Sequence, residues 1–394
     1  MARNDVRRRQ IEHILDGSRG LSNENLTILN DYDSELRIAR KSVSCRYNAL
    51  HVLRKLALHC DDKCYIDMVK SDLVSWFATL DSLKQSSITN YTINIKAFFK
   101  WLYNMEDTYP DVVRWIKIKN GNGSKVRKLP TDLVSVDEVK SMIAATDNVR
   151  DAALIAVLYE SAGRVGEIIS LDIEDVTVDQ YGVVIMVDGK TGVRRLRLID
   201  SAPYIIQWIN SHPMKDDRKA PLFVGFSNSS YGMRISEESI RRLLITISKR
   251  AGVRKHVHPH LFRHSRMTEL AKVLTEQEMK IYAGWVGDSK MAGIYVHLSG
   301  MDLESKLLQN AGLLDREETR EANEVLKPRD CPRCKETNPA TAKFCYRCGM
   351  ALDLQTAIEI DEKKNAETLE LMDLVQREPR VFEILKAATN AQSG

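Results

Sequence analysis

Six residues spread between positions 164 and 295 have side chains that together suit chemistry at a phosphodiester. Arginine and lysine side chains neutralise phosphate oxygens, and a histidine can hold or pass a proton. An indole N–H can donate to a phosphate oxygen, and a phenol can act as a nucleophile once it is deprotonated. None of these groups needs a metal ion for that work. The six residues are Arg164, Lys190, His260, Arg263, Trp285 and Tyr295.

Arg164 and Lys190 stand in contexts that suit phosphate binding and proton donation. Arg164 lies in AGRVGEIISL, where Gly163 precedes it and Glu167 follows on the same helix face. An arginine oriented by such a carboxylate suits bidentate phosphate contact, although an ordinary Arg–Glu helix pair has the same spacing. Lys190 lies in VDGKTGVRRLRL, at the expected tip of a β-hairpin. From there an ammonium group can protonate a leaving oxygen, and a solvated turn lysine is the alternative.

His260 and Arg263 are three residues apart in HPHLFRH, so on a helix they share one face. One can pass a proton near a phosphate oxygen while the other neutralises it, and His264 is expected to support the pair. Four histidines within nine residues would also fit a metal site, but no paired carboxylate or cysteine accompanies them. The spacing therefore favours proton transfer and charge stabilisation over metal binding.

Trp285 and Tyr295 complete the set within AGWVGDSKMAGIYVH. The indole N–H can donate to a non-bridging phosphate oxygen, and a buried structural tryptophan is the alternative. A phenol loses its proton only near pH ~10, so Tyr295 needs cations close by to act as a nucleophile. Tyr282 is the rival tyrosine, but it lies in an apolar helical stretch and is expected in the core.

The elements that must position these residues form two helical regions separated by a linker. Residues 28–116 are expected to form a helical bundle after an N-terminal helix or arm at 1–27, in which residues 2–17 form a short polar helix. Residues 132–312 begin with a capping box between Ser135 and Glu138 and mix helices with one hairpin. Further helices are expected at 42–59, 70–82, 86–105, 136–146, 150–161, 203–211, 237–250, 260–274 and 276–283, with strands joined at 188–192.

The linker, residues 117–131, combines turn-forming glycine, asparagine and serine with basic residues. Residues 1–130 hold 22 Lys and Arg against 15 Asp and Glu, a surplus of 7. Such a surplus fits a polyanionic partner, and a solvated basic face is an equal alternative on charge alone. The expected DNA contacts in the linker are Lys119, Lys125, Arg127 and Lys128.

Four cysteines form two Cys-x-x-Cys knuckles in CPRCKETNPATAKFCYRCG, within a module at 331–351. Thiolates at this spacing bind structural zinc in a closed tetrahedral site, while a redox dithiol would need a βαβ context that is missing. A charged linker at 313–330 precedes the module, and a helical tail at 353–394 follows it. Its basic side chains and acidic flanks leave DNA and another subunit open as partners. The expected ligands are Cys331, Cys334, Cys345 and Cys348.

The composition is that of an ordinary globular protein, with 43% hydrophobic and 28% charged residues. A chain of 394 residues is long enough for two to three domains. No apolar run approaches the roughly 18 to 20 residues that span a membrane, and the start MARNDVRRRQ lacks an apolar signal core. We therefore expect no membrane partner and a cytoplasmic protein.

The order Arg, Lys, His-x-x-Arg, Trp, Tyr, with these local contexts, resembles the tyrosine recombinases, the phage integrase and Xer-type group. AGRVGEIISL looks like the first arginine box of the family, VDGKTGVRRLRL like its lysine hairpin, HPHLFRH like its His-x-x-Arg box and AGWVGDSKMAGIYVH like its tyrosine box. The resemblance covers roughly residues 28–312. Most Xer-type members have His where Trp285 stands, and some phage recombinases have Trp there.

The resemblance implies a mainly α fold with a small β-hairpin or sheet: an N-terminal helical core-binding domain, a catalytic domain and then a small zinc ribbon. It also implies that Tyr295 attacks a DNA phosphate to form a 3′-phosphotyrosyl link, while Lys190 protonates the 5′ oxygen. The remaining four of the six residues would stabilise the transition state. Catalysis would need neither metal nor ATP, with structural zinc confined to the ribbon.

The implied partner is double-stranded DNA at specific recombination sites, bound by a homo-tetramer. Two alternatives remain open at this point. One is a non-catalytic DNA-binding or architectural protein on the same scaffold. The other is relaxation of DNA by the same chemistry without partner exchange, as in type IB topoisomerases.

Overall fold

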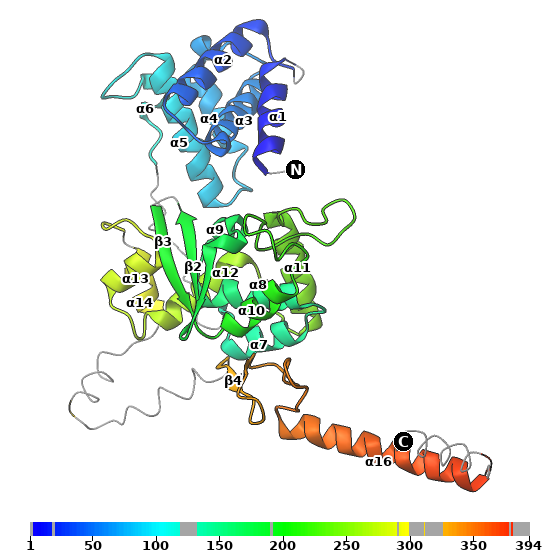
Figure 1. The fold of residues 1–394 in the computed structure, drawn as a ribbon. Coiled ribbons are helices and arrows are strands. Elements are labelled where there is room, and N and C mark those ends of the chain that lie inside the picture. Colours follow the sequence, from blue (N-terminus) through cyan, green and yellow to red (C-terminus); the bar gives the residue numbers. More distant parts are fainter. Residues whose placement is uncertain are drawn as a thin grey trace. The chain divides into compact units, whose positions relative to one another are not determined.

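The computed structural model describes residues 3–17, 20–118, 132–189, 192–289, 291–298, 311, 326–377 and 380. The chain divides into two compact units, Met1–Arg127 and Lys128–Gly394 (Figure 1). In the described residues, helices predominate over a three-stranded antiparallel sheet and a two-stranded one. This confirms the expected fold class. Among the described helices, none is both long and apolar enough to cross a membrane.

The first unit is a helical bundle around an aromatic and aliphatic core. Its long helices are α1 (Arg3–Leu15), α2 (Asn23–Ile38), α3 (Val43–His59) and α5 (Gln85–Leu102), with the shorter α4 (Lys70–Ala78), α6 (Asp111–Arg114) and the 3₁₀ turn η1 (Tyr65–Asp67). Helix α1 packs against α3, and its Ile11 and Ile14 are each 2% exposed. The expected N-terminal helix is present, and it packs into the core of this unit.

Helix α2 was missing from the predicted elements because its buried face is partly polar. Asn25 is fully buried and donates to the Asp62 carbonyl at 3.1 Å and to the Asp62 carboxylate at 2.8 Å. Asp33 is 2% exposed and accepts from Arg46 Nη2 at 2.6 Å. Hydrogen bonds and charge pairing let these groups be buried, so apolar periodicity alone does not reveal the helix.

Helix α8 (Val149–Glu160) is the centre of the second unit, with ten of its twelve residues buried. It packs against α7 (Val136–Ala144), α10 (Ala202–Asn210) and α12 (Pro259–Leu270). The predicted capping box at Ser135 is confirmed, and Ser236 caps α11 (Glu237–Arg250) as expected. The remaining helices are α9 (Val165–Ser170), the 3₁₀ turn η3 (Ile173–Asp175), α13 (Glu276–Ala283) and α14 (Met291–Leu298).

The predicted hairpin is formed by β2 (Gly182–Gly189) and β3 (Gly192–Leu198), paired antiparallel with Gly189 opposite Gly192. A further strand, β1 (Val176–Asp179), extends the sheet on the β2 side in the order β1-β2-β3. Helices α9 and α10 contact β2 (Figure 1). Along β3, side chains 194, 196 and 198 point away from solvent while 193 and 195 are exposed. This alternation decides which hairpin residues can reach the site.

The cysteine module belongs to the second unit. It contains β4 (Arg329–Asp330) and β5 (Thr337–Asn338), and α16 (Leu354–Arg377) follows it. Leu326 is 5% exposed within the main core cluster, and the hydroxyls of Tyr204 on α10 and Thr341 lie 2.9 Å apart. These contacts attach the module to the helical body.

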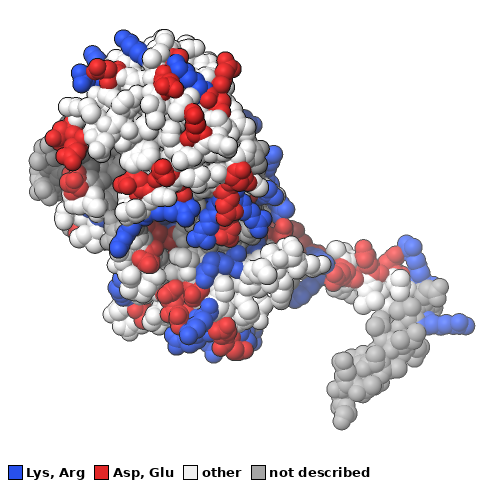
Figure 2. Space-filling model, turned by 90° about the horizontal axis from the view of Figure 1, so that it is seen from above, with Lys and Arg blue, Asp and Glu red and all other residues white. Residues whose placement is uncertain are grey.

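On the face seen in Figure 2, acidic and basic side chains are interspersed.

Candidate active site

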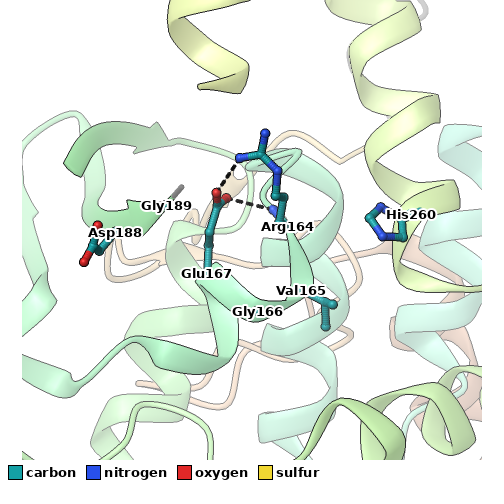
Figure 3. A pocket seen from close by; sticks show the side chains of 7 residues that line it. All are labelled: Arg164, Val165, Gly166, Glu167, Asp188, Gly189 and His260. Atoms are coloured by element: carbon teal, nitrogen blue, oxygen red, sulfur yellow. Dashed lines mark hydrogen bonds and ion pairs between the residues drawn. The ribbon is translucent and has the colours of Figure 1, made fainter. Parts of the chain in front are cut away.

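A pocket of about 410 Å³ opens where α9, the β2–β3 hairpin and α12 meet. Figure 3 shows Glu167 between Gly189 and Arg164, with His260 approaching from α12 on the other side. The lining residues are Arg164, Val165, Gly166, Glu167, Asp188, Gly189 and His260. The pocket thus joins two of the six predicted residues, Arg164 and His260, with the end of β2 that precedes Lys190.

Arg164 is held at the start of α9 by Glu167, as expected. Its backbone N–H donates to Glu167 Oε2 at 2.9 Å, and its Nη1 donates to Oε1 at 2.7 Å (Figure 3). Its Nη2 donates to the Gly284 carbonyl at 3.2 Å. The turn before it contains Ala162, a buried non-glycine residue with φ +46°, a conformation that stores backbone strain. The side chain remains one-third exposed at 33%, so the guanidinium can still meet a ligand in the pocket.

Glu167 also pairs with Arg194, a residue that sequence reasoning did not select. Arg194 Nη2 donates to Oε2 at 2.6 Å and Nη1 donates to Oε1 at 3.1 Å. Burial opposes ionisation of Glu167, but hydrogen bonds from Arg194 and Arg164 outweigh it and lower its pKa to about 2. The carboxylate is therefore ionised and shared between two guanidinium groups. The available signal was an arginine at an inward-facing position of a predicted strand.

Arg263 is 6% exposed on α12. Its Nη1 donates to the Ala162 carbonyl at 2.5 Å and its Nη2 to the Ala283 carbonyl at 2.8 Å. Burial, and then the nearby charge of Arg164, lower its pKa to about 10, so it stays protonated at neutral pH. The guanidinium groups of Arg164 and Arg263 together attract anions, because neither is fully neutralised by carboxylates.

His260 and Arg263 both lie on α12, as predicted, but at different depths. His258 is the N-cap of α12, Pro259 is its first residue and His260 its second. The side chain of His260 is exposed and lines the pocket, while that of Arg263 is buried. His264, the next residue after Arg263, contacts the tyrosine. Its Nδ1 lies 2.8 Å from the Tyr295 hydroxyl. The tautomer of His264 decides which of the two atoms is the donor.

Tyr295 on α14 is buried, with 1% of its surface exposed. Its ring stacks on Trp285 with centroids 5.5 Å apart and planes 11° apart, and the Arg263 guanidinium lies 5.6 Å from the Trp285 ring. Burial raises the pKa of the phenol, and Arg263 lowers it by less. In this arrangement burial therefore has a larger effect on the phenol than Arg263 has. Trp285 forms one wall of the tyrosine site.

Tyr282 occupies a core position, as predicted for the rival tyrosine. Its hydroxyl donates to the Glu160 carbonyl at 2.8 Å, and burial raises its pKa to about 12. It packs against both the main core cluster and the cluster that contains Tyr295. A phenol already committed to a backbone carbonyl is a poor candidate for the nucleophile.

Several predicted residues lie outside the described part of the chain. Lys190 follows Gly189, the last described residue of β2, so only the flanks of its turn are placed. The four basic linker residues, Lys119, Lys125, Arg127 and Lys128, also lie outside it.

The four cysteines of the module form a compact cluster whose sulfur atoms all lie within 4.8 Å of one another. Sγ of Cys331 is 3.6 Å from Sγ of Cys348, and Sγ of Cys334 is 3.6 Å from Sγ of Cys345. A tetrahedral zinc ion with Zn–S bonds of about 2.3 Å requires sulfurs about 3.8 Å apart. The donor set and its spacing therefore fit a structural metal ion.

Comparisons with known proteins agree on one family. The model of the Phage integrase family matches residues 133–300, a range that contains all six predicted residues. Tyrosine recombinase XerD of Bifidobacterium longum (strain NCC 2705) is 27% identical over 254 residues, covering 59% of this chain and 78% of the relative. Tyrosine recombinase XerC of Escherichia coli O1:K1 / APEC is 24% identical over 266 residues, covering 65% and 84%. Residues 133–300 are thus a Phage integrase domain, and the chain is similar to tyrosine recombinases.

Solved structures share the fold of this recombinase at low sequence identity. A lambda integrase dimer bound to a COC′ core site matches with a TM-score of 0.56 at 15% identity, covering 73% of this chain and 80% of that one. The XerH recombinase bound to palindromic difH, a post-cleavage complex, matches with a TM-score of 0.54 at 18% identity, covering 77% and 94%. The likeness confirms the predicted recombinase fold.

Proposed function

We propose that this recombinase cuts and rejoins duplex DNA at specific sites through a covalent bond between Tyr295 and a 3′ phosphate. As a tyrosine recombinase, the chain is a site-specific DNA strand transferase. The observation that carries the residue assignment is the shared attachment of two arginines to one loop. Arg263 and Arg164 bind the successive carbonyls of Ala283 and Gly284, just before Trp285 and the helix that bears Tyr295.

The proposed reaction exchanges one phosphoester for another. The Tyr295 oxygen attacks phosphorus, the bond to the 5′ oxygen breaks, and Lys190 gives its proton to that oxygen. The phenol proton leaves to a nearby base. Arg164 and Arg263 stabilise the charge that develops on the phosphate oxygens, with His260 donating from the pocket rim. A 5′ hydroxyl from a second strand then reverses the sequence, so the bond energy is conserved without ATP.

The buried phenol requires a movement before the reaction. With 1% of its surface exposed and its hydroxyl held by His264, Tyr295 cannot meet a phosphate in the described arrangement. We propose that DNA binding shifts α14 so that the hydroxyl reaches the arginine pocket. The described state is then a resting state in which burial keeps the phenol protonated.

A suicide substrate tests the nucleophile. Nicked duplexes carrying a site selected from a random library by covalent capture are incubated with the full chain, and protein–DNA adducts are resolved on denaturing gels. We expect an adduct with the wild type and with Tyr282→Phe, and none with Tyr295→Phe, while all three proteins bind the DNA. An adduct with Tyr295→Phe would refute the assignment. DNA binding without any wild-type adduct would favour the architectural alternative.

Exchange of strands tests the reaction class. Two differently labelled duplexes should yield recombinant products with this recombinase. If the protein relaxed supercoiled plasmid but never exchanged labels, the topoisomerase alternative would hold. A solved structure with the same fold is a lambda integrase tetramer bound to a Holliday junction, which matches with a TM-score of 0.55 at 14% identity. We propose the same tetrameric state here, which sedimentation of the protein on paired sites would measure.

We further propose that the basic linker contributes phosphate contacts to duplex DNA. Each phosphate neutralised changes the slope of log K against log[salt] by about −0.9. Replacing Lys119, Lys125, Arg127 and Lys128 by Ala should therefore flatten the slope by up to about 3.6. Lys363→Ala with Lys364→Ala, on the exposed α16, is the control. An unchanged slope in the fourfold variant would contradict the proposal.

We also propose that the protein acts in the cytoplasm, because its proposed substrate is DNA.

We also propose that the cysteine cluster binds zinc in a structural role. The four-sulfur donor set supports zinc, because a closed thiolate tetrahedron leaves no position for a substrate. Metal analysis of the purified chain should find one zinc per chain, lost when Cys331 and Cys334 are replaced by Ser. Cys45→Ser, an exposed cysteine of the first unit, should leave the zinc content unchanged. A folded module without any metal would refute the proposal.

A further inference from the structure

Three arginines bind three successive carbonyls at the end of α13. Arg194 Nε donates to the Tyr282 carbonyl at 3.1 Å, Arg263 Nη2 to Ala283 at 2.8 Å and Arg164 Nη2 to Gly284 at 3.2 Å. The last carbonyls of a helix have no partner within it and carry partial negative charge. Gly284 ends the helix at φ +61°. The guanidinium groups thus fix the turn that leads to Trp285 and Tyr295.

Arg194 is the member of this set that lies behind the pocket. It projects inward from β3, is 10% exposed and does not line the pocket. Its three nitrogens all bond to protein oxygens: Nε to the Tyr282 carbonyl, and Nη1 and Nη2 to the two oxygens of Glu167. A side chain committed in this way acts on the reaction through its partners.

The hairpin backbone closes over the Arg194–Glu167 ion pair. A Cβ atom added to Gly189 would overlap Oε1 of Glu167 and would lie 3.1 Å from Nη1 of Arg194. The residue before Lys190 therefore lies directly against this pair. Arg194 is consequently linked to Arg164 through Glu167, and it binds the helix end that precedes Trp285 through the Tyr282 carbonyl.

We propose that Arg194 is a positioning residue for strand cleavage, an inference that rests on the proposed function. It holds Glu167 so that this carboxylate takes only Nη1 and the backbone N–H of Arg164, which leaves Arg164 partly exposed toward the pocket. Without Arg194, Glu167 has one cation fewer and draws the Arg164 guanidinium into a closed two-point pair. The end of α13 also loses the bond to the Tyr282 carbonyl. Both changes misplace reacting groups without removing a DNA contact.

The test measures binding and cleavage separately in the full-length protein. Single-turnover cleavage of the suicide substrate at saturating protein gives the rate, and gel shift gives Kd. We expect Arg194→Ala to cleave about 100-fold more slowly, the loss typical of a misplacement near 1 Å, with Kd within about threefold of wild type. Arg195→Ala, an exposed neighbour on the opposite face of the same strand, should cleave at the wild-type rate.

Two further variants separate positioning from loss of the fold. Arg194→Lys keeps the charge but cannot reach both Glu167 oxygens and the Tyr282 carbonyl, so it should cleave roughly tenfold more slowly than wild type. In a Glu167→Gln background, Arg194→Ala should cost much less than its 100-fold effect, because the carboxylate link is already lost. If Arg194→Ala does not fold, the cleavage rate of Arg194→Lys relative to wild type tests the positioning role.

The possible results distinguish a failure of the positioning role of Arg194 from a failure of the proposed function. Wild-type cleavage by both Arg194→Lys and a folded Arg194→Ala would overturn the positioning role and leave the proposed function intact. An equal loss of binding and cleavage would also overturn it, since a positioning residue changes the rate at constant Kd. Absence of any adduct from the wild-type protein would overturn the proposed function and the inference with it.

Discussion

The arginine site and the cysteine cluster bring charged groups together in opposite ways. At the arginine site, Glu167 pairs with Arg164 and with Arg194, 27 residues further along the chain. In the cysteine cluster, all four donors come from residues 331–348 and share one sign of charge once ionised. At the first site, ion pairs formed by the fold offset part of the charge, and a net positive charge remains for an anion. At the second site, the proposed zinc ion would offset the charge of the thiolates.

The largest expected effect comes from removing two of the four cysteines that we propose as zinc ligands. Replacing Cys331 and Cys334 by Ser should unfold the module, because binding of structural zinc supplies on the order of 10 kcal/mol to such sites. Hydrogen exchange should show rapid exchange across residues 329–352 and unchanged protection in α8. Loss of protection in α8 would show that the helical body also depends on the metal.

Removing the carboxylate of Glu167 should destabilise the arginine site. Glu167→Gln leaves two guanidinium groups without their anion, which costs about 3 kcal/mol for a buried pair. Because the folded pKa of Glu167 lies near 2, below its ordinary value of 4.5, its contribution is present above about pH 4.5 and disappears as pH falls through 2. Urea unfolding should therefore show a gap between variant and wild type at pH 7 that narrows toward pH 2.

The control for this measurement is Glu362→Gln, on the exposed face of α16. It should leave the urea midpoint unchanged over the same pH range. A gap for Glu167→Gln that stays constant with pH would mean that packing of the side chain, and not its charge, stabilises the site.

A smaller effect is expected where the hairpin meets the ion pair. Gly189→Ala places a methyl group against Oε1 of Glu167 and should lower the free energy of unfolding by about 1–3 kcal/mol. Gly166→Ala has open space around its Cβ and should be neutral or stabilising. Thermal unfolding of the two variants measures the difference. Equal stability would show that the hairpin can move away from Glu167.

The smallest effect tests the connection between the two regions. Tyr204→Phe removes the hydroxyl that lies 2.9 Å from Thr341 and should destabilise docking of the module by about 1 kcal/mol. Tyr65→Phe is a matched control, because the buried Tyr65 hydroxyl has no hydrogen-bond partner among the described residues. Protease cleavage between 326 and 354 should accelerate in Tyr204→Phe alone. Equal rates would mean that the hydroxyl pair does not hold the module.

The contrast between a local cluster and a dispersed site also explains which features could be predicted from the sequence. The cysteine ligands, the Ser135 and Ser236 caps and the hairpin follow from spacings of a few residues. Arg194 was missed because its partners lie 27 and 88 residues away, at Glu167 and Tyr282. Local patterns carry no information on such pairings.

The tyrosine environment shows the same limit. The motif indicated Tyr295, but its burial and its contact with His264 depend on how α14 packs against α12. Helix α2 was missed for a related reason, since its polar core residues are explained only by partners in other elements.

The burial of Tyr295 beneath Trp285 also protects the protein from side reactions. A phenol that solvent cannot reach is inaccessible to nitrating or alkylating reagents, whereas Tyr181 and Tyr231, which are 67% and 63% exposed, would be modified first. Under the proposed function, this shielding would keep the nucleophile unmodified until DNA binding exposes it.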